Sequence, residues 1–180
     1  MVPKVAPMMM TSKLSMKWAS EAKEPPAAPP SPESVRGRAL ALLTQREHAR
    51  GELAVKLGEW GASEELITAI LDELVERGLQ DDGRFAEVFV RSRRQRGSGP
   101  QVISQELKQR GVAAELIQAH VQEGEYDWQE EAVAVRRRRF GDALPTDRRE
   151  QGRQLRFLQY RGFSTAHAMK AIKYTEPDGE

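Results

Sequence analysis

The side chains of this sequence best suited to binding chemistry are arginines at helical spacing. Arg149, Arg153 and Arg156 follow one another at intervals of four and three residues, so they share one face of a helix. Tyr160 continues the same face. A row of guanidinium groups can follow a phosphate backbone, and an aromatic ring beside it can stack on a base. We therefore predict a surface for an anionic partner here, with solvated helix charge as the alternative.

Two other groups of arginines are candidates for the same chemistry. Arg84, Arg91 and Arg94 share the helix face opposite Phe85 and Phe89. The full set of candidate residues for binding a partner or DNA is Arg84, Arg91, Arg94, Arg137, Arg138, Arg149, Arg153, Arg156 and Tyr160.

The run of four arginines from Arg136 to Arg139 fans around its helix. Arg136 and Arg139 fall near the apolar face, where their aliphatic stems would cover apolar surface. Arg137 and Arg138 point elsewhere, and for this reason they belong to the candidate set.

No constellation of residues predicts an enzyme. The chain has no cysteine, which excludes disulfides, thiolate zinc sites and cysteine nucleophiles. His48, His120 and His167 take apolar-face positions far apart in the sequence, so packed histidines are favoured over metal ligands or catalytic bases. We expect no cofactor and no metal.

Two short motifs have structural interpretations. Gly97-Ser98-Gly99-Pro100 contains a GxG spacing, but no strand precedes it and no Lys-Ser/Thr follows. We interpret it as a loop, with Gly99 in the turn and Pro100 at the first position of a helix. Asp81 and Asp82 lack nearby metal ligands and are predicted to cap the helix that follows.

The charge of the chain is segregated. Its 28 Lys+Arg and 27 Asp+Glu nearly cancel, yet acidic residues dominate from Glu47 to Asp82 and arginines dominate from Arg136 to Arg161. This distribution suits a protein that lies against an anionic partner, or against a partner with its own charge pattern.

The elements that must position these charges are all helices. Apolar residues recur at helical intervals, as in the run from Leu66 to Val75, which Ser63 precedes as N-cap and Gly78 follows. A Leu four residues before a Gly recurs at Leu57, Leu107 and Leu158, at spacings of 50 and 51 residues. The predicted helices are 36–44, 48–59, 63–77, 83–96, 100–110, 113–123, 127–140, 147–161 and 164–174.

This spacing predicts an all-α fold of three tandem three-helix repeats that form an elongated, curved array. The predicted parts are a disordered Pro/Ala-rich tail at 1–34, an acidic repeat 1 at 35–80, repeat 2 at 81–124, a basic repeat 3 at 125–175 and a frayed end at 176–180. No segment has the length and apolarity of a membrane span, and the N-terminus is a poor signal peptide. We expect a soluble, cytoplasmic protein.

Several of these residues resemble the RecX family of regulatory proteins. The stretch Asp81-Asp82-Gly83-Arg84-Phe85-Ala86, with Arg93, Gly97, Gly99-Pro100, Glu106-Leu107 and Gly111 after it, is similar to the middle of that family. Ala39 to Leu43, Arg46 and Glu52-Leu53 look like its opening, and Phe157-Leu158 with Arg161-Gly162-Phe163 like its closing segment. The resemblance covers about Arg36 to Tyr174 and leaves the proline-rich tail outside it.

The resemblance implies a fold of three three-helix repeats and a function that composition alone does not indicate. It implies a negative regulator that binds the RecA recombinase, chiefly its filament on single-stranded DNA, and inhibits its ATPase, strand exchange and co-protease activity. Such a protein modulates recombinational repair and the SOS response. We expect a monomer that contacts RecA, with single-stranded DNA as a further candidate partner.

Two other function classes stay open at this point. A helix-turn-helix or winged-helix transcription regulator could use Glu47 to Leu79 as its core, with Asp81 to Phe89 as a wing, but no second strand follows and the helix from Glu64 is acidic. A helical protein–protein adaptor would leave the arginines solvated.

Overall fold

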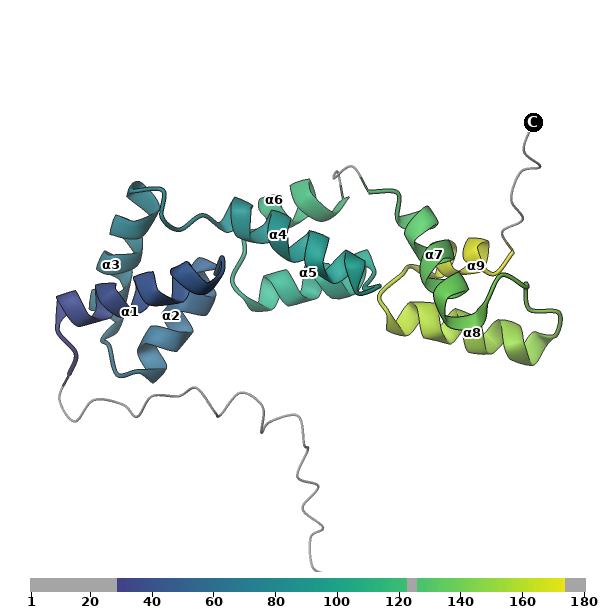
Figure 1. Cartoon of the computed structure of the whole chain (residues 1–180), viewed down its shortest axis with the longest axis horizontal. Helices are drawn as coiled ribbons and strands as arrows, with labels where there is room; N and C mark the ends of the chain where they lie inside the picture. The colour runs from purple at the N-terminus through teal and green to yellow at the C-terminus, as the bar shows by residue number, and fades with distance from the viewer. Residues whose placement is uncertain (1–28, 123–125, 174–180) are drawn as a thin grey trace, which may run out of the picture.

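The computed structural model describes residues 29–122 and 126–173, and within these ranges the chain is all-α. Figure 1 shows the helices in three groups, arranged one after another along an elongated molecule. Repeat 1 contains α1 (Pro32–Gln45), α2 (Arg50–Glu59) and α3 (Glu64–Glu76). Repeat 2 contains α4 (Asp82–Gln95), α5 (Pro100–Gln109), α6 (Ala114–Ile117) and the π-helical turn η3 (Gln118–Gln122). Repeat 3 contains α7 (Trp128–Phe140), α8 (Arg148–Tyr160) and α9 (Thr165–Ala171).

The first helix begins earlier than predicted. The Ser31 side chain accepts a hydrogen bond from the Ser34 amide, and Pro32 stands at the first helical position, where its missing N–H costs no hydrogen bond. α1 therefore starts at Pro32 rather than at 36, so the boundary at 34 placed the first residues of this helix in the tail. The rest of the predicted tail, residues 1–28, lies outside the described residues, as does the predicted frayed end.

Most of the predicted caps are present. Ser63 accepts from the Leu66 amide at the start of α3, and Gly78 follows that helix with a positive φ of 66°. Of the two candidate aspartates, Asp81 caps α4 by accepting from the Arg84 amide at 2.9 Å. These contacts satisfy backbone groups that a helix end leaves without an internal partner.

Two helices differ from their predicted form. The predicted helix 113–123 is divided into α6 and the π-helical η3, and the Val121 carbonyl there accepts a hydrogen bond from the Trp128 indole at 2.8 Å. This contact ties the end of repeat 2 to the start of repeat 3. The last helix, α9, ends at Ala171 instead of 174, because Ile172 caps it and a turn follows.

The loop before α5 is built differently from its prediction. Gly97, not Gly99, has the positive φ of 78° that the turn requires. Gly99 is extended, with a φ of −87°, and precedes Pro100 as the N-cap residue of α5. A Cβ on Gly99 would stand only 2.5 Å from the Gly162 carbonyl carbon, so this glycine is required by a close approach to repeat 3.

The apolar core is divided unequally among the repeats. One buried cluster belongs to repeat 1 alone and includes Leu53, Leu57 and Leu74. The other runs through repeats 2 and 3, from Phe85 to Ile172, and also takes in Ala49 from repeat 1. Repeats 2 and 3 therefore share a core, as stacked repeats do.

None of the helices in the described ranges is long and apolar enough to cross a bilayer. In the same ranges, no three His, Asp or Glu side chains come together in a group that could hold a metal ion. His48 is buried, and His120 and His167 are half-buried, as the apolar-face positions predict.

Candidate interaction surface

The Asp-Asp-Gly-Arg motif forms a joint between repeats 1 and 2. Asp82 accepts hydrogen bonds on Oδ1 from the Arg50 amide and from the Gln80 side chain, both at 2.8 Å. The buried Gln80 side chain also donates to the His48 carbonyl at 3.2 Å. One carboxylate thus joins the start of α2 to the start of α4 through paired polar groups.

Arg84, a predicted binding residue, belongs to the same joint. Its Nε donates to Glu47 at 3.1 Å, and its other nitrogens donate to the carbonyls of Gly78 and Leu79 at 3.0 and 3.4 Å. The guanidinium group bridges α4, the end of α3 and the segment before α2. The Arg84 side chain is exposed, and these bonds tie it to the joint.

Glu52 lies beside this joint in an unusual electrostatic environment. Burial raises the pKa of Glu52, but the adjacent His48 and Arg46 side chains outweigh this effect and hold it at about 2. Arg46 Nη2 lies 2.6 Å from one carboxylate oxygen, and His48 Nδ1 lies 3.3 Å from the other. The carboxylate stays ionised and fixes the turn between α1 and α2.

The other two candidates on α4 differ in their surroundings. Arg91 is exposed and pairs with Glu87 of the same helix at 2.7 Å. Arg94 reaches across to repeat 3, where it pairs with Glu131 at 2.6 Å and lies over the Tyr126 ring, 4.3 Å from its centroid. Arg94 therefore connects two repeats, and Arg91 remains on the outer surface.

The arginines of α7 divide in the same way. Arg138 is exposed and donates to the Gln95 carbonyl at the end of α4 at 3.4 Å. Arg137 is half-buried, with Nε 3.6 Å from Asp142. Arg136 is buried and donates to the carbonyls of Asp142 and Ala143, which fixes the loop before α8. Burial lowers the pKa of Arg136 from its ordinary value.

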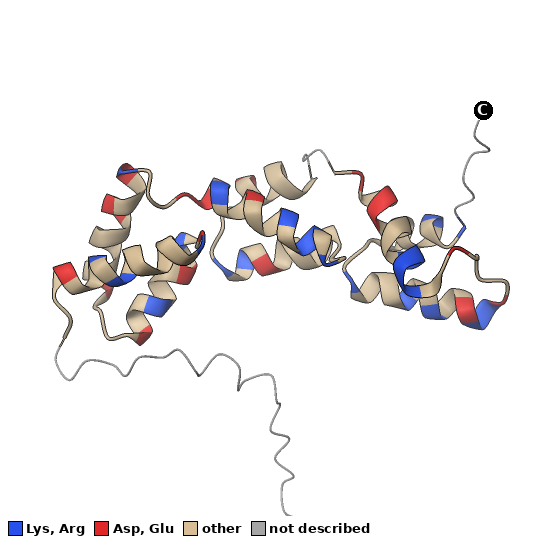
Figure 2. Ribbon diagram, in the orientation of Figure 1, with Lys and Arg blue, Asp and Glu red and all other residues tan. Residues whose placement is uncertain are grey.

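The predicted stripe on α8 is present on the surface. Arg149, Arg153 and Arg156 are all exposed, and Tyr160 is 86% exposed. Leu158 lies on the opposite, buried side of the helix. Figure 2 shows blue ribbon along α8 and at the end of α7, whereas repeat 1 carries much of the red. The helical register thus brings these four side chains to one accessible face.

Aromatic rings support this basic face from beneath. The rings of Phe140 and Phe157 meet edge to face, with centroids 5.2 Å apart. Arg153 lies over Phe140 at 5.1 Å from its centroid, and the exposed Arg139 lies over the same ring at 5.9 Å. Arg161 lies over Phe157 at 5.3 Å. Cation–π contacts of this kind orient guanidinium groups, and Arg153 also pairs with Glu150 of the same helix at 3.1 Å.

Arg139 and Arg161 are members of this surface that the sequence analysis did not select. Arg139 was predicted to cover apolar surface, but its side chain is exposed over Phe140. The signal that could have found both is an aromatic residue adjacent to Arg139 and another four residues before Arg161. We call the exposed arginines Arg139, Arg149, Arg153 and Arg156, together with Arg161 and Tyr160, the α8 surface.

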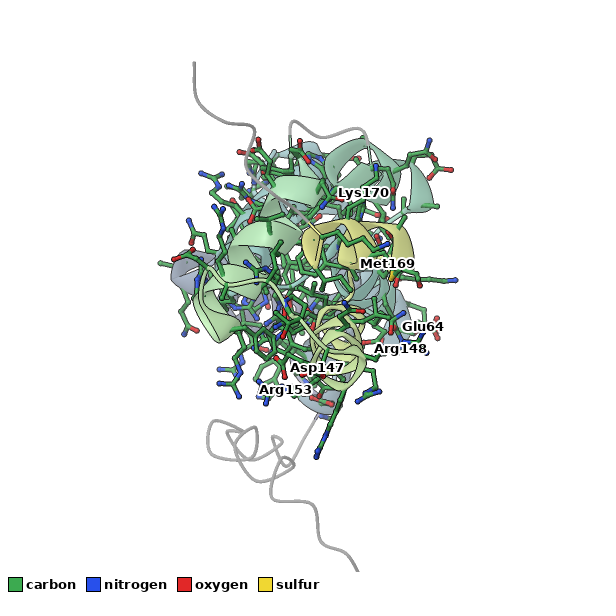
Figure 3. The ribbon with its side chains drawn as sticks, turned by 90° about the vertical axis from the view of Figure 1, so that its right-hand side faces the viewer. Glu64, Asp147, Arg148, Arg153, Met169 and Lys170 are labelled. Atoms are coloured by element: carbon green, nitrogen blue, oxygen red, sulfur yellow. The ribbon has the colours of Figure 1, made fainter. Side chains whose placement is uncertain are left out.

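Figure 3 views the molecule from the end of repeat 3, so that the start of α8 faces the viewer. Asp147, which caps α8 by accepting from the Glu150 amide at 2.8 Å, is labelled there with Arg148 and Arg153. These arginines lie at the free end of the array, where no further repeat follows among the described residues. The α8 surface is therefore open both along the helix and at its start.

Three models of one family match the chain. The RecX first three-helix domain matches residues 36–74, the second matches 81–120 and the third matches 125–172. These matched segments correspond to the three groups of helices in the structure.

Named relatives and solved structures agree with this assignment. A regulatory protein RecX of Halorhodospira halophila is 51% identical over 148 residues, which are 82% of this chain and 92% of the relative. One of Pseudomonas savastanoi is 47% identical over 133 residues, 74% of this chain and 86% of the relative. The fold is similar to a crystal structure of RecX from Lactobacillus salivarius, with a TM-score of 0.66 and 23% identity, over 79% of this chain and 94% of that one. With its three matched domains and these relatives, the chain belongs to the RecX family of regulatory proteins.

Proposed function

We propose that this chain is a negative regulator of the RecA recombinase that binds RecA filaments on single-stranded DNA. Bound in this way, it inhibits the ATPase, strand exchange and co-protease activity of RecA, and so modulates recombinational repair and the SOS response. Membership of the RecX family supports this proposal, and so does the elongated shape. An array of three repeats can contact several RecA protomers at once and gain avidity without a deep pocket.

The observation that carries the choice of surface is the arrangement of the α8 surface. Exposed guanidinium groups lie along one helix, with Arg153 over the Phe140 ring, beside an 86% exposed tyrosine ring. Such a surface suits a phosphate backbone or an acidic patch of RecA. We assign the contact with the filament to this surface, together with Arg137 and Arg138 of α7, and keep Arg91 of α4 as a separate candidate contact.

The remaining candidates have a different place in the proposal. Arg84 and Arg94 hold neighbouring repeats together, so we expect their substitution to act through the shape of the array. The protein works as a regulator rather than an enzyme, without a cofactor or metal, in the cytoplasm where its partner acts.

The test is a binding experiment with the full chain. Binding to RecA–ATP filaments on single-stranded DNA is measured against naked single-stranded DNA, duplex DNA and free RecA, and the DNA-dependent ATPase is followed in the same samples. We expect binding that favours the filament, with a falling ATPase. Binding to naked duplex alone with an unchanged ATPase would overturn the proposal and favour a transcription regulator.

A charge-reversed pair of variants locates the surface. We expect Arg149→Glu/Arg156→Glu to weaken filament binding by about tenfold to a hundredfold, because two exposed cations become anions beside a polyanion. Arg38→Glu/Arg77→Glu in repeat 1 is the control, since it changes the net charge by the same amount. Equal losses from both variants would assign the effect to net charge rather than to the α8 surface.

A further inference from the structure

Both internal junctions of the array depend on a glycine that another backbone approaches closely. A Cβ on Gly51, near the start of α2, would stand 2.4 Å from the Arg110 carbonyl oxygen and 3.2 Å from the Gly111 Cα. Gly99, the N-cap residue of α5, also lies close to Gly162, with 2.5 Å to its carbonyl carbon, although the repeat spacing makes Gln101 rather than Gly99 the counterpart of Gly51. At each junction, the start of the second helix of one repeat lies against the glycine that follows the second helix of the next repeat.

In repeat 1, the glycine that follows the second helix has no such contact. Gly61 corresponds in the repeat to Gly111 and Gly162, and all three have similar φ values of 99°, 80° and 92°. A Cβ on Gly61, however, would meet nothing within 4 Å among the described residues. The Gly61 backbone has the same conformation as Gly111 and Gly162, but no neighbouring repeat packs against it among the described residues.

In repeat 3, the glycine on the second helix that corresponds to Gly51 also has no such contact. Gly152 of α8 corresponds to Gly51, because the repeat spacings of 50 and 51 residues separate them by 101 positions. A Cβ on Gly152 would meet the flexible Arg156 Nη1 at 3.4 Å and no backbone within 4 Å in the described structure. Figure 1 places the loop after α2 and the start of α8 at opposite ends of the molecule.

The surroundings of Gly61 and Gly152 include side chains of opposite charge. Beside the internal contact, a cavity of about 570 Å³ is lined by Val55 of α2 and by Gln109 at the end of α5. The residue that corresponds to Val55 in repeat 3 is Arg156, and the residue that corresponds to Gln109 in repeat 1 is Glu59. The same geometry between two molecules would therefore set an exposed arginine opposite an exposed glutamate.

We propose that a second copy of this chain docks the Gly61 end of its repeat 1 on Gly152 of α8, head to tail, in the geometry of the Gly51–Gly111 junction. The charge complementarity and the internal example of the contact at Gly51–Gly111 both favour another copy as the occupant. The interface is heterologous, so it joins copies in a row rather than in a closed dimer. The corresponding internal cavity is open, so the arginines of α8 remain accessible beside the contact.

The interface is small, as each internal junction consists of few residues, and the dilute chain is expected to stay a monomer. The contact forms where copies are concentrated, for instance side by side on an extended partner. Binding side by side on such a partner raises the local concentration of repeat 1 of one copy near repeat 3 of the next.

The absence of cysteine from the chain allows a direct test by thiol cross-linking. Glu59→Cys and Arg156→Cys are purified separately as full chains, and a short bismaleimide is added to each variant alone and to their mixture at high concentration. We expect about tenfold more product in the mixture than in either variant alone, because only the mixed pair brings the two thiols together.

A matched glycine pair provides the control. Gly152→Leu, introduced into Arg156→Cys, fills the docking point within a helix and is expected to abolish the excess of mixed product. Gly37→Leu, also within a helix but at an exposed position with open space around it, is expected to leave that excess unchanged. Equal yields from the mixture and the single variants, or an excess that survives Gly152→Leu, would overturn the proposal. Because RecA is absent, this result is independent of the function proposed above.

Discussion

The junction between repeats 1 and 2 and the junction between repeats 2 and 3 use similar glycine contacts but differ in what surrounds them. Around the first, the connections are polar: Arg50 and Gln80 donate to Asp82, and cavities of about 470 and 570 Å³ border the Gly51 contact. Around the second, Gly99 donates its amide to the Arg161 carbonyl at 2.6 Å, and a shared apolar cluster runs through both repeats.

This difference indicates which parts of the array move together. Shared apolar core couples neighbouring repeats into one cooperative unit, whereas a polar joint beside open cavities leaves the neighbours more independent. We therefore expect repeats 2 and 3 to unfold more nearly as one unit, which carries the α8 surface. Repeat 1, with its own core, is attached to that unit through the Asp82 joint.

The largest expected effect comes from Gly99→Ala. The new Cβ would overlap the Gly162 backbone at 2.5–2.6 Å, and neither chain can shift without breaking the Gly99 amide hydrogen bond. We expect the free energy of unfolding of the repeat 2–3 unit to fall by about 3 kcal/mol. Urea unfolding followed by tryptophan fluorescence measures it, with Gly37→Ala as the helical control. A loss below about 0.5 kcal/mol would contradict the close approach described here.

Gly51→Ala tests the other junction with the same chemical change. The Cβ would stand 2.4 Å from the Arg110 carbonyl oxygen, but open cavities on both sides let repeat 1 move away. We expect a smaller loss, about 1–2 kcal/mol, confined to repeat 1. Hydrogen exchange resolves this, since protection should decrease in α2 and α3 but not in α7 and α8. Equal decreases in all repeats would show that the two junctions are equally cooperative.

Acidification tests the polar side of the first junction. The pKa of Glu52 is about 2 in the folded chain, against an ordinary value of 4.5, so the unfolded chain binds a proton first as pH falls. The stabilising contribution of Glu52 is therefore complete above pH 4.5 and is lost progressively as pH falls from there towards 2. We expect about 1–2 kcal/mol at neutral pH, allowing for screening at its solvent edge.

Glu52→Gln is the variant for this measurement. Its stability should lie below that of the parent chain at pH 7 and converge with it at low pH, as measured by thermal unfolding across that range. A constant difference between the two chains at all pH values would refute the charge-based explanation.

The smallest expected effect distinguishes a junction arginine from a surface arginine. Arg94→Met removes the ion pair with Glu131 and the contact with the Tyr126 ring, which should cost about 1 kcal/mol in the repeat 2–3 unit. Arg91→Met, on the outer face of the same helix, should change stability by less than about 0.5 kcal/mol. Thermal unfolding of both variants compares them, and equal effects would remove the distinction drawn between these two residues.

Helix type and repeat order could be predicted because they depend on neighbours in the sequence. Periodic apolar residues identified the helix that contains Ile67 and Leu71, and Ser63 and Gly78 marked its ends. The start of α1 was placed too late because Ser31 and Pro32 follow a proline-rich stretch that suggests a tail. Serine and proline are typical both of a helix start and of a linker, so these residues alone do not distinguish the two.

The candidate site was predictable only in part. The α8 stripe is exposed as its register predicts, because a helix on the edge of the array has one free face. The roles of Arg84 and Arg94 were not predictable, because their partners Glu47 and Glu131 each lie 37 residues away. A long arginine side chain can reach either solvent or another repeat, and its own helix does not determine which.

The sequence by itself determined the helices, their three-fold repetition and the opposite charges of the first and third repeats, since these follow from local periodicity and composition. Only the tertiary structure decided how the repeats meet: that Gly99 serves a close approach rather than a turn, and that Asp82 and Arg84 form a joint. It also decided that two phenylalanine rings lie beneath Arg139, Arg153 and Arg161. The physical reason is that packing and ion pairing act between surfaces distant in the chain, and their geometry exists only once the repeats are stacked.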